Sequence, residues 1–236
     1  MSSHSAAVHR KDDRSGQQLT TGAFFDMDYT ILRGSSGKLY MRYLRSNGRL
    51  SALAWTRIMA MSGLYAIGLL EFPTLMARLT ATVASLGEGE AWKSSQDWFD
   101  SMLRDFIAER ARQRVAEHLS KGDHVAIVSA ATPYAVAPVA AELGLGARYL
   151  ATRLEIRAGR FTGRIVTPAC YGPGKVTLVQ GYAREHGIDL SRSFFYSDSH
   201  SDLPLLEAVG HPVAVNPSAK LRRIAEARAW PVVRFY

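Results

Sequence analysis

The sequence predicts an α/β fold in which a mainly parallel sheet is flanked by helices, with an all-helical segment inserted after the first strand. Short continuous apolar runs recur along the chain, and such runs are typical of strands buried on both faces of a parallel sheet. Helical stretches that end at a glycine separate these runs. Strands that alternate with helices favour right-handed crossovers, so the expected core is a Rossmann-like parallel sheet.

Four apolar runs are expected to form the strands of this sheet. They are GAFFD at 22–26, HVAIVS at 124–129, SFFYSD at 193–198 and, with a weaker pattern, PVAVN at 212–216. The segment RLEIRAGRFTGRI at 153–165 predicts two further short strands around a turn that contains glycine. The first run leads into FFDMDYTI, whose two aspartates belong beside a buried strand only where something offsets their desolvation.

Three helices are expected between and after these strands. PYAVAPVAAELG follows Thr132, a favourable N-cap residue, with Pro133 at the first helical position and Gly144 at the end. KVTLVQGYAREHG ends at Gly187 and DLPLLEAVG ends at Gly210. A glycine just after the last helical residue is a common stop signal, so these endings support the alternation of strands and helices.

The interval between the first two strands has helical patterns alone. In WFDSMLRDFIAERARQRVAEHL, at 98–119, apolar residues recur at helical spacing and predict one amphipathic helix. The chain is therefore expected to divide into a mobile tail (1–21), a catalytic core in two pieces (22–34 and 118–236) and a helical cap (35–117).

The composition limits the classes of partner. The 236 residues include 29 Lys and Arg against 21 Asp and Glu, which gives a formal net charge of +8. The basic residues are scattered and the sequence has no nucleic-acid-binding motif, so a small anionic partner is favoured over nucleic acid. The single cysteine, Cys170, excludes an internal disulfide and a multi-cysteine zinc site, and it suits the reducing cytoplasm.

Two segments bear on membranes. Residues 1–20 are polar and lack the apolar core of a secretory signal. The apolar run Ala52–Leu70 has about the length of a bilayer span, but Arg57 lies inside it, and Gly63 and Gly68 weaken it. A buried helix or helical hairpin is therefore expected rather than a transmembrane span, while shallow contact with a membrane or a lipid-like substrate stays open.

Candidate site residues follow three of the predicted strands, at the edge where chemistry gathers in an open parallel sheet, and Lys175 opens a predicted helix after GPG. These candidate site residues are Asp26, Asp28, Thr30, Ser129, Ala130, Lys175, Asp198 and Asp202. Each of these residues alone could simply cap a helix or carry a surface charge. Their occurrence after four separate segments favours a single site on one rim.

These residue types permit one particular chemistry. Asp26 and Asp198 would place two negative charges close together, which is unfavourable without a cation. Oxygen ligands gathered at one edge of the sheet suit Mg²⁺. A carboxylate beside Mg²⁺ can attack phosphorus and form an aspartyl-phosphate. A second carboxylate two residues later, here Asp28, can protonate the leaving alcohol and then activate water. Lys175 can neutralise a carboxylate and a phosphate together.

The order of these residues resembles that of the haloacid dehalogenase-like (HAD) phosphohydrolases. DMDYT matches their D-x-D-x-T first motif, Ser129 falls at the second motif and Lys175 at the third. YSDSHSDLPLLEAVG is similar to the fourth motif of the phosphoserine-phosphatase-like subclass, subclass IB. The matched motifs extend from Asp26 to Gly210. A helical cap after the first motif is also a feature of this subclass.

The resemblance implies a role for each matched residue. Asp26 would be the nucleophile and a ligand of Mg²⁺. Asp28 would be the general acid and base, with its backbone carbonyl completing the metal shell. Asp198 would be the third protein ligand of the metal. Ser129 and Lys175 would bind the phosphoryl group.

Three further matched residues would support this set. Thr30 would brace the loop beside the phosphate. The backbone N–H groups that follow Ser129, beginning with Ala130, would hold a phosphate oxygen. Asp202 would support Lys175 or a metal-bound water.

The expected activity is therefore Mg²⁺-dependent hydrolysis of a phosphomonoester. Phosphoserine phosphatases usually carry a glutamate shortly after the first motif to bind the substrate amine, whereas ILRGSSGKLY has no acidic residue and Arg33 reverses the sign. This favours another small or lipid-like phosphate ester, such as histidinol phosphate or a lysophospholipid. The alternatives are a phosphoserine phosphatase and a non-catalytic phosphate sensor or receiver-like module.

Overall fold

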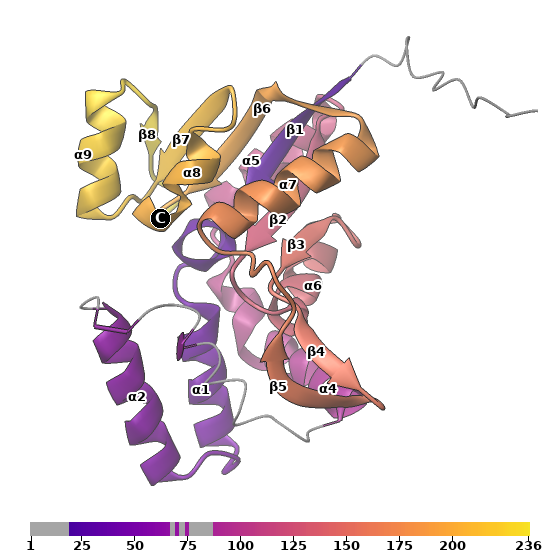
Figure 1. Cartoon of the computed structure of the whole chain (residues 1–236), viewed down its shortest axis with the longest axis vertical. Coiled ribbons are helices and arrows are strands. Elements are labelled where there is room, and N and C mark those ends of the chain that lie inside the picture. The colour runs from indigo at the N-terminus through magenta and orange to yellow at the C-terminus, as the bar shows by residue number, and fades with distance from the viewer. Residues whose placement is uncertain (1–18, 67–68, 71–73, 76–86) are drawn as a thin grey trace, which may run out of the picture.

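The structure is a computed structural model that describes residues 19–66, 69–70, 74–75 and 87–236. Six strands form its central sheet: β1 (Thr20–Phe25), β2 (His124–Ser129), β3 (Tyr149–Ala151), β6 (Ile188–Ser197), β7 (His211–Val215) and β8 (Val232–Val233). They lie in the order β3-β2-β1-β6-β7-β8, and every neighbouring pair is parallel (Figure 1). The predicted fold class is confirmed.

Helices cover both faces of this sheet. One face carries α5 (Glu109–Ser120) and α6 (Pro133–Glu142), and the other carries α7 (Pro173–His186), α8 (Leu203–Leu206) and α9 (Ala219–Ala227). Successive residues of β1 enter opposite layers, since Phe25 packs in the first and Phe24 in the second. Burial on both faces explains why the strands read as continuous apolar runs.

The insert between β1 and β2 is helical in its described part and lies in the lower half of Figure 1. It contains α1 (Ser36–Ser46), α2 (Ala52–Ala66), α4 (Glu88–Trp98) and two short helical turns, η2 (Phe99–Leu103) and η3 (Arg104–Phe106). A separate antiparallel pair, β4 (Leu154–Arg157) with β5 (Arg160–Ile165), confirms the two short strands predicted there. Gly87 joins this pair to the insert through a β-bridge with Arg160.

The prediction of one helix over 98–119 is wrong. After η3 the chain becomes extended at Ile107 and Ala108, and only then does α5 begin. Ile107 forms a β-bridge with Leu32, and the Ala108 amide donates to the carbonyl of Ile31 at 2.8 Å. Helical spacing of apolar residues could not show this break, because the bonds that cause it are made to the turn after β1.

Smaller differences concern the ends of elements. β1 begins at Thr20, inside the segment predicted as a tail, and β6 begins at Ile188, well before the predicted run. β3 and β8 were not predicted, because three and two residues give no usable periodicity. Thr132 occupies the N-cap position of α6, but its side chain makes no capping hydrogen bond.

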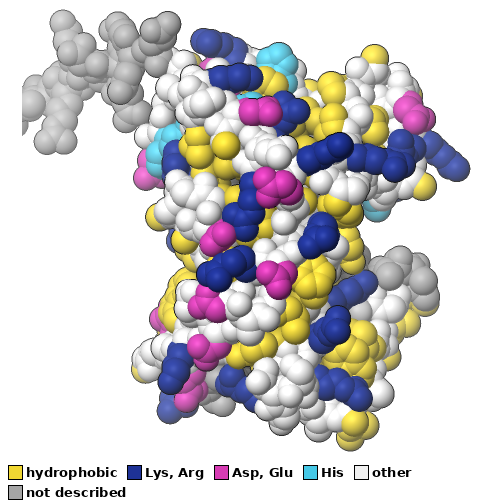
Figure 2. All heavy atoms as spheres, turned by 180° about the vertical axis from the view of Figure 1, so that it is seen from behind, with side chains coloured by type: hydrophobic (Ala, Val, Ile, Leu, Met, Phe, Trp, Pro, Cys, Tyr) yellow, Lys and Arg dark blue, Asp and Glu magenta, His cyan; other side chains and the backbone are white. Residues whose placement is uncertain are grey.

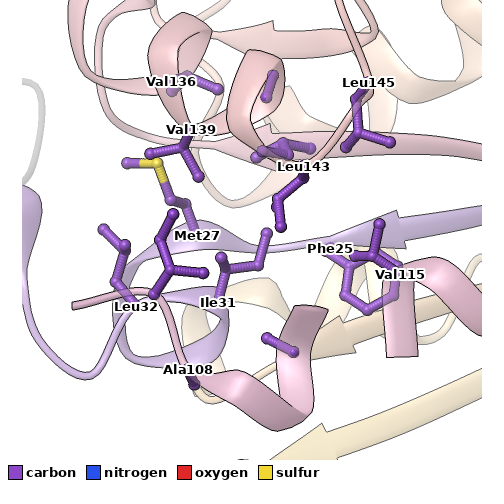
Figure 3. Packing of buried hydrophobic residues seen from close by; sticks show 14 of the residues in the cluster. Phe25, Met27, Ile31, Leu32, Ala108, Val115, Val136, Val139, Leu143 and Leu145 are labelled. Atoms are coloured by element: carbon purple, nitrogen blue, oxygen red, sulfur yellow. The ribbon is translucent and has the colours of Figure 1, made fainter. Parts of the chain in front are cut away.

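The turn after β1 is anchored in the hydrophobic core. Met27, Ile31 and Leu32 are completely buried, and Figure 3 shows them with Phe25 between residues of α6 and residues of α5. Tyr29, near the middle of the turn, has a φ of 55°, a left-handed conformation that is uncommon for a residue with a Cβ atom. The apolar residues of MDYTIL therefore anchor this turn to the core.

The apolar run Ala52–Leu70 does not form a buried helix. α2 covers its first part, and residues 67–68 lie outside the described residues. On α2, Ile58 is 5% exposed but Leu53 is 62% exposed, so the expected burial is wrong for one side of the helix. Within the described ranges, no helix is long and apolar enough to cross a membrane.

Two glycines of α7 provide a matched test of packing. A Cβ at Gly174 would lie 2.0 Å from the backbone oxygen of Ala169, whereas a Cβ at Gly181 would meet nothing within 4 Å. We expect Gly174→Ala to lower the free energy of unfolding by about 1–3 kcal/mol, because the start of α7 must shift. We expect Gly181→Ala to raise it by about 0.5–1 kcal/mol. Urea unfolding followed by circular dichroism measures both, and equal effects would contradict the close approach.

Candidate active site

The ammonium group of Lys175 links two aspartates from distant parts of the chain. Its Nζ donates to Oδ1 of Asp26 at 2.8 Å and to Oδ2 of Asp202 at 2.7 Å. The side chains of Lys175 and Asp202 are each 2% exposed and that of Asp26 is 10% exposed. Asp26 directly follows β1, Lys175 lies in the first turn of α7 and Asp202 ends the short turn η4 (His200–Asp202). The structure thus brings three of the predicted site residues into direct contact.

Asp26 and the nearby Asp198 resist ionisation. Burial, followed by the charge of Asp202, raises the pKa of Asp26 to about 7, against the opposing effect of Lys175. Burial, with the charges of Asp26 and Asp202, raises the pKa of Asp198 to about 8. Burial alone would lower the pKa of Lys175, but the two aspartates outweigh it and raise that pKa. If these aspartates ionise together, the site would hold more negative charge than Lys175 balances.

Asp28 lies near enough to this cluster for its charge to act on Asp26, and its own hydrogen bond is to the insert. Its Oδ1 accepts a hydrogen bond from the backbone N–H of Ser36 at 3.0 Å, at the start of α1. Burial raises the pKa of Asp28, and hydrogen bonds from Ser36 and Ser35 partly offset this rise. Asp28 is thus joined to α1, whose first turn provides backbone donors for a carboxylate.

The remaining predicted residues lie around the same sheet edge. Ser129 ends β2, the neighbour of β1, and its Oγ accepts from the Ala131 amide at 3.2 Å. Ala130 is half-buried between them. Thr30 is completely buried, and its Oγ1 has no hydrogen-bond partner among the described residues.

Several residues around the site were missed by the sequence analysis. Ser197 donates to Oδ2 of Asp202 at 2.7 Å, and its place directly before Asp198 was an available signal. Cys170 lies close enough for Lys175 and Asp202 to act on its charge, and burial raises the pKa of its thiol to about 12. A lone cysteine between a turn and a helix gave no signal of this position.

Two further residues that the sequence analysis missed form hydrogen bonds to the turn after β1. The Tyr236 hydroxyl donates to the carbonyl of Tyr29 at 3.0 Å, and Nδ2 of Asn216 donates to the same carbonyl at 3.3 Å. Oδ1 of Asn216 in turn accepts from the Phe235 amide at 3.0 Å. Tyr29 is the residue with positive φ, so its peptide is held in this conformation by side chains 187 and 207 positions away. No local pattern could have predicted these contacts.

The comparisons with known proteins identify the family. A model of the haloacid dehalogenase-like hydrolases matches residues 23–207, and the chain belongs to this family. A phosphoserine phosphatase of Mycobacterium tuberculosis is 34% identical over 92% of this chain and 71% of its own length. A histidinol-phosphatase of Neisseria meningitidis is 30% identical over 90% of this chain and 98% of its own.

Solved structures agree with the fold. A protein of unknown function from Bordetella pertussis is 34% identical, with a TM-score of 0.85, over 92% of this chain and 100% of that one. A phosphoserine phosphatase with a phospho-aspartyl intermediate analogue has a TM-score of 0.66 at 18% identity, over 93% and 95% of the two chains. The second likeness concerns the fold alone.

The residues present fit the Mg²⁺ ion that hydrolases of this fold generally use. Asp26, Asp198 and Asp202 supply three carboxylates against the one ammonium of Lys175, and an added divalent cation would balance the excess. In the described residues, no group of three or more His, Cys, Asp or Glu side chains is arranged to hold a metal. A site with two carboxylates, a backbone carbonyl and water agrees with both facts, since Mg²⁺ keeps several waters.

Mg²⁺ should stabilise the fold more strongly at high pH than at low pH. In the metal-free fold Asp26 and Asp198 keep protons up to about pH 7 and 8, whereas an unfolded chain releases them near pH 4. Their contribution to stability is therefore lost as pH rises from about 4 to about 8. Mg²⁺ favours the ionised carboxylates, so at about 100 Kd it should raise Tm by about 5–11 °C near pH 8, and by less near pH 5.

Thermal unfolding monitored by circular dichroism measures this difference. Asp198→Asn should reduce the Mg²⁺-induced rise in Tm at high pH. Asp97→Asn, an exposed aspartate of α4 far along the chain from the cluster, should leave it unchanged. A rise that is the same at both pH values, or the same in Asp198→Asn, would contradict the assignment of this cluster to a cation.

The contact from Tyr236 should control the mobility of the turn after β1. Tyr236→Phe removes one hydrogen bond to the Tyr29 carbonyl but keeps the ring. The loss of about 1 kcal/mol of local stability should speed amide exchange in a peptide covering 26–34 by about fivefold. Hydrogen–deuterium exchange with mass spectrometry measures this rate. A peptide from α9 serves as the internal control, and unchanged exchange at 26–34 would show that the contact does not restrain the turn.

Proposed function

We propose that this protein is a phosphatase, a Mg²⁺-dependent phosphomonoester hydrolase that acts through an aspartyl-phosphate on Asp26. The observation that carries the proposal is the contact of Lys175 with Asp26 and Asp202 at the carboxyl end of β1, with Asp28 two residues further on. The family supports a hydrolase, and the names of the two relatives support phosphate esters as substrates.

Asp26 is proposed as the nucleophile. Lys175 binds Oδ1, which keeps the carboxylate oriented and favours its ionised form, and leaves Oδ2 for attack on phosphorus. The new bond joins Oδ2 to phosphorus while the bond from phosphorus to the alcohol oxygen breaks. Mg²⁺, held by Asp26, Asp198 and the Asp28 carbonyl, would supply charge neutralisation for the carboxylates and the phosphoryl oxygens.

Asp28 is proposed as the general acid and then the general base. Its raised pKa favours the protonated form needed to give a proton to the leaving alcohol. The ionised carboxylate that remains is stabilised by the Ser36 N–H, and it can take a proton from the water that hydrolyses the aspartyl-phosphate. Because Ser36 opens α1, the position of the insert bears on both proton transfers.

The phosphoryl group is proposed to lie between β1 and β2. Lys175 provides one positive charge and the Ser129 hydroxyl one donor, and the Ala130 backbone N–H would add another. The unpartnered Oγ1 of Thr30 is available to brace the turn once substrate is bound. Asp202 fixes Lys175 from the opposite side, with Ser197 as its own donor.

The proposed substrate is a small or lipid-like phosphate ester. Arg33 lies in the stretch that would bind the substrate amine in a phosphoserine phosphatase. Its guanidinium donates to the backbone carbonyl of Asp105. It therefore offers no acidic partner for an amine, and this argues against phosphoserine. Phosphoserine stays the alternative, because one of the relatives is named a phosphoserine phosphatase. A cytoplasmic location is proposed from the single buried thiol of Cys170.

Phosphate release tests the proposal. An aryl phosphate and a panel containing phosphoserine, histidinol phosphate and a lysophosphatidate are supplied with Mg²⁺ or with a chelator. We expect turnover only with Mg²⁺. Asp26→Asn should lower kcat by about a thousandfold or more, and Asp28→Asn by about 10²–10⁴-fold.

Asp97→Asn is the matched control, because it removes one exposed carboxylate from α4 and should keep full activity. Thermal unfolding shows whether each variant is folded. No Mg²⁺-dependent turnover on any ester of the panel would contradict the phosphatase and favour the phosphate sensor. Highest kcat/KM for phosphoserine would instead overturn the substrate proposal alone.

A further inference from the structure

One side of α1 carries a row of basic side chains. Lys38, Arg42 and Arg45 follow one another at spacings of four and three residues, which places them on one face of α1, and Arg49 follows three residues after the helix ends at Ser46. All four are exposed. Within the described part of the chain, none of them forms an ion pair with a carboxylate, although Arg49 donates to Oγ of Ser94. We name this row the basic row.

The outward side of α2 is mostly apolar, with the exposed Arg57 between Leu53 and Ala60. Leu53 and Leu64 are 62% and 40% exposed, with Ala60 exposed between them, whereas Ile58 on the other side of the helix is buried. Arg57 is the sole charged residue of α2. Single exposed leucines are ordinary, but two of them on one helical face, with an exposed alanine between them, indicate an interaction surface. This exposed set is named the apolar face.

The two helices that carry the basic row and the apolar face pack against each other. The guanidinium of Arg45 lies over the ring of Trp55, 5.4 Å from its centroid, so α1 and α2 meet at this pair. Figure 1 shows the two helices side by side. In Figure 2, seen from behind, the lower right side of the molecule shows dark-blue and yellow side chains next to each other and no magenta.

The charge of this segment is one-sided. From Tyr29 to Leu70 the sequence has six basic residues and no Asp or Glu. The whole chain has a formal charge of +8, so most of its excess positive charge lies in this segment. An occupant of the surface must therefore be anionic and must also accept exposed leucines.

We propose that the basic row and the apolar face of the α1–α2 hairpin bind the surface of an anionic lipid bilayer. Basic residues are attracted to anionic headgroups, and apolar side chains on the neighbouring helix enter the boundary between headgroups and acyl chains. An acidic protein would satisfy the charges but would leave the leucines in contact with carboxylates. The binding is peripheral, because the described helices cannot span a membrane.

This surface also reaches the candidate site. Nζ of Lys38, the first residue of the basic row, lies 3.5 Å from the hydroxyl of Tyr29 in the turn after β1. A bilayer held by this row would lie beside the entrance to the turn. The proposal of lipid binding does not depend on the proposed phosphatase activity, since binding is measured without a substrate.

Co-sedimentation with lipid vesicles tests the proposal. The full chain is mixed with vesicles of phosphatidylcholine alone or of phosphatidylcholine with phosphatidylglycerol. We expect binding to the anionic vesicles, weakened by added salt, and little binding to the neutral ones. Arg42→Glu with Arg45→Glu should weaken binding at least about tenfold. Leu53→Ser with Leu64→Ser should weaken it while keeping its dependence on salt.

The matched control reverses two charges on another helix. Lys220 and Arg223 are exposed on α9 with the same spacing as Arg42 and Arg45, and Lys220→Glu with Arg223→Glu should keep vesicle binding. Equal loss in this control would show general attraction of a basic protein and overturn the proposal. Absence of binding by the full chain to anionic vesicles would also overturn it. Self-association of the chain, measured by sedimentation velocity and abolished by the leucine substitutions, would overturn it as well.

Discussion

The contact of the Lys175 ammonium with Asp26 and Asp202 positions three separate segments of the chain. Desolvated charges are costly unless they are paired with good geometry, so β1, α7 and the turn after β6 must approach closely enough for this pairing. Gly174 permits that approach, because the Ala169 carbonyl leaves no space for a Cβ there. Buried ion pairs contribute little net stability, and this cluster instead fixes Asp26, the proposed nucleophile, beside a positive charge at the edge of the sheet.

The turn that carries the two aspartates is restrained from both sides. On the core side, Met27, Ile31 and Leu32 are buried against α5 and α6 (Figure 3). Outside the core, the side chains of Asn216 and Tyr236 donate hydrogen bonds to the Tyr29 carbonyl. The left-handed conformation of Tyr29 is thus kept by contacts on each side, as expected where backbone strain persists at a functional site.

The sequence predicted the parts of the molecule that depend on local patterns. The strands β1, β2 and β7 were found because each is a short apolar run, and the aspartates because they follow such runs. The break between η3 and α5 could not be found, since Ile107 leaves the helix to pair with Leu32. The same holds for the contacts of Tyr236 and Asn216. Such features arise from distant pairings, which no window of neighbouring residues contains.

The restraint on Tyr29 has a consequence for biosynthesis. Its partners Asn216 and Tyr236 are translated 187 and 207 residues later, because synthesis runs from the N-terminus, and a domain folds as a unit. β1 and its turn are therefore made long before the side chains that hold the Tyr29 peptide in place. Chains interrupted late in translation would contain every acidic residue of the site and still lack its final restraint.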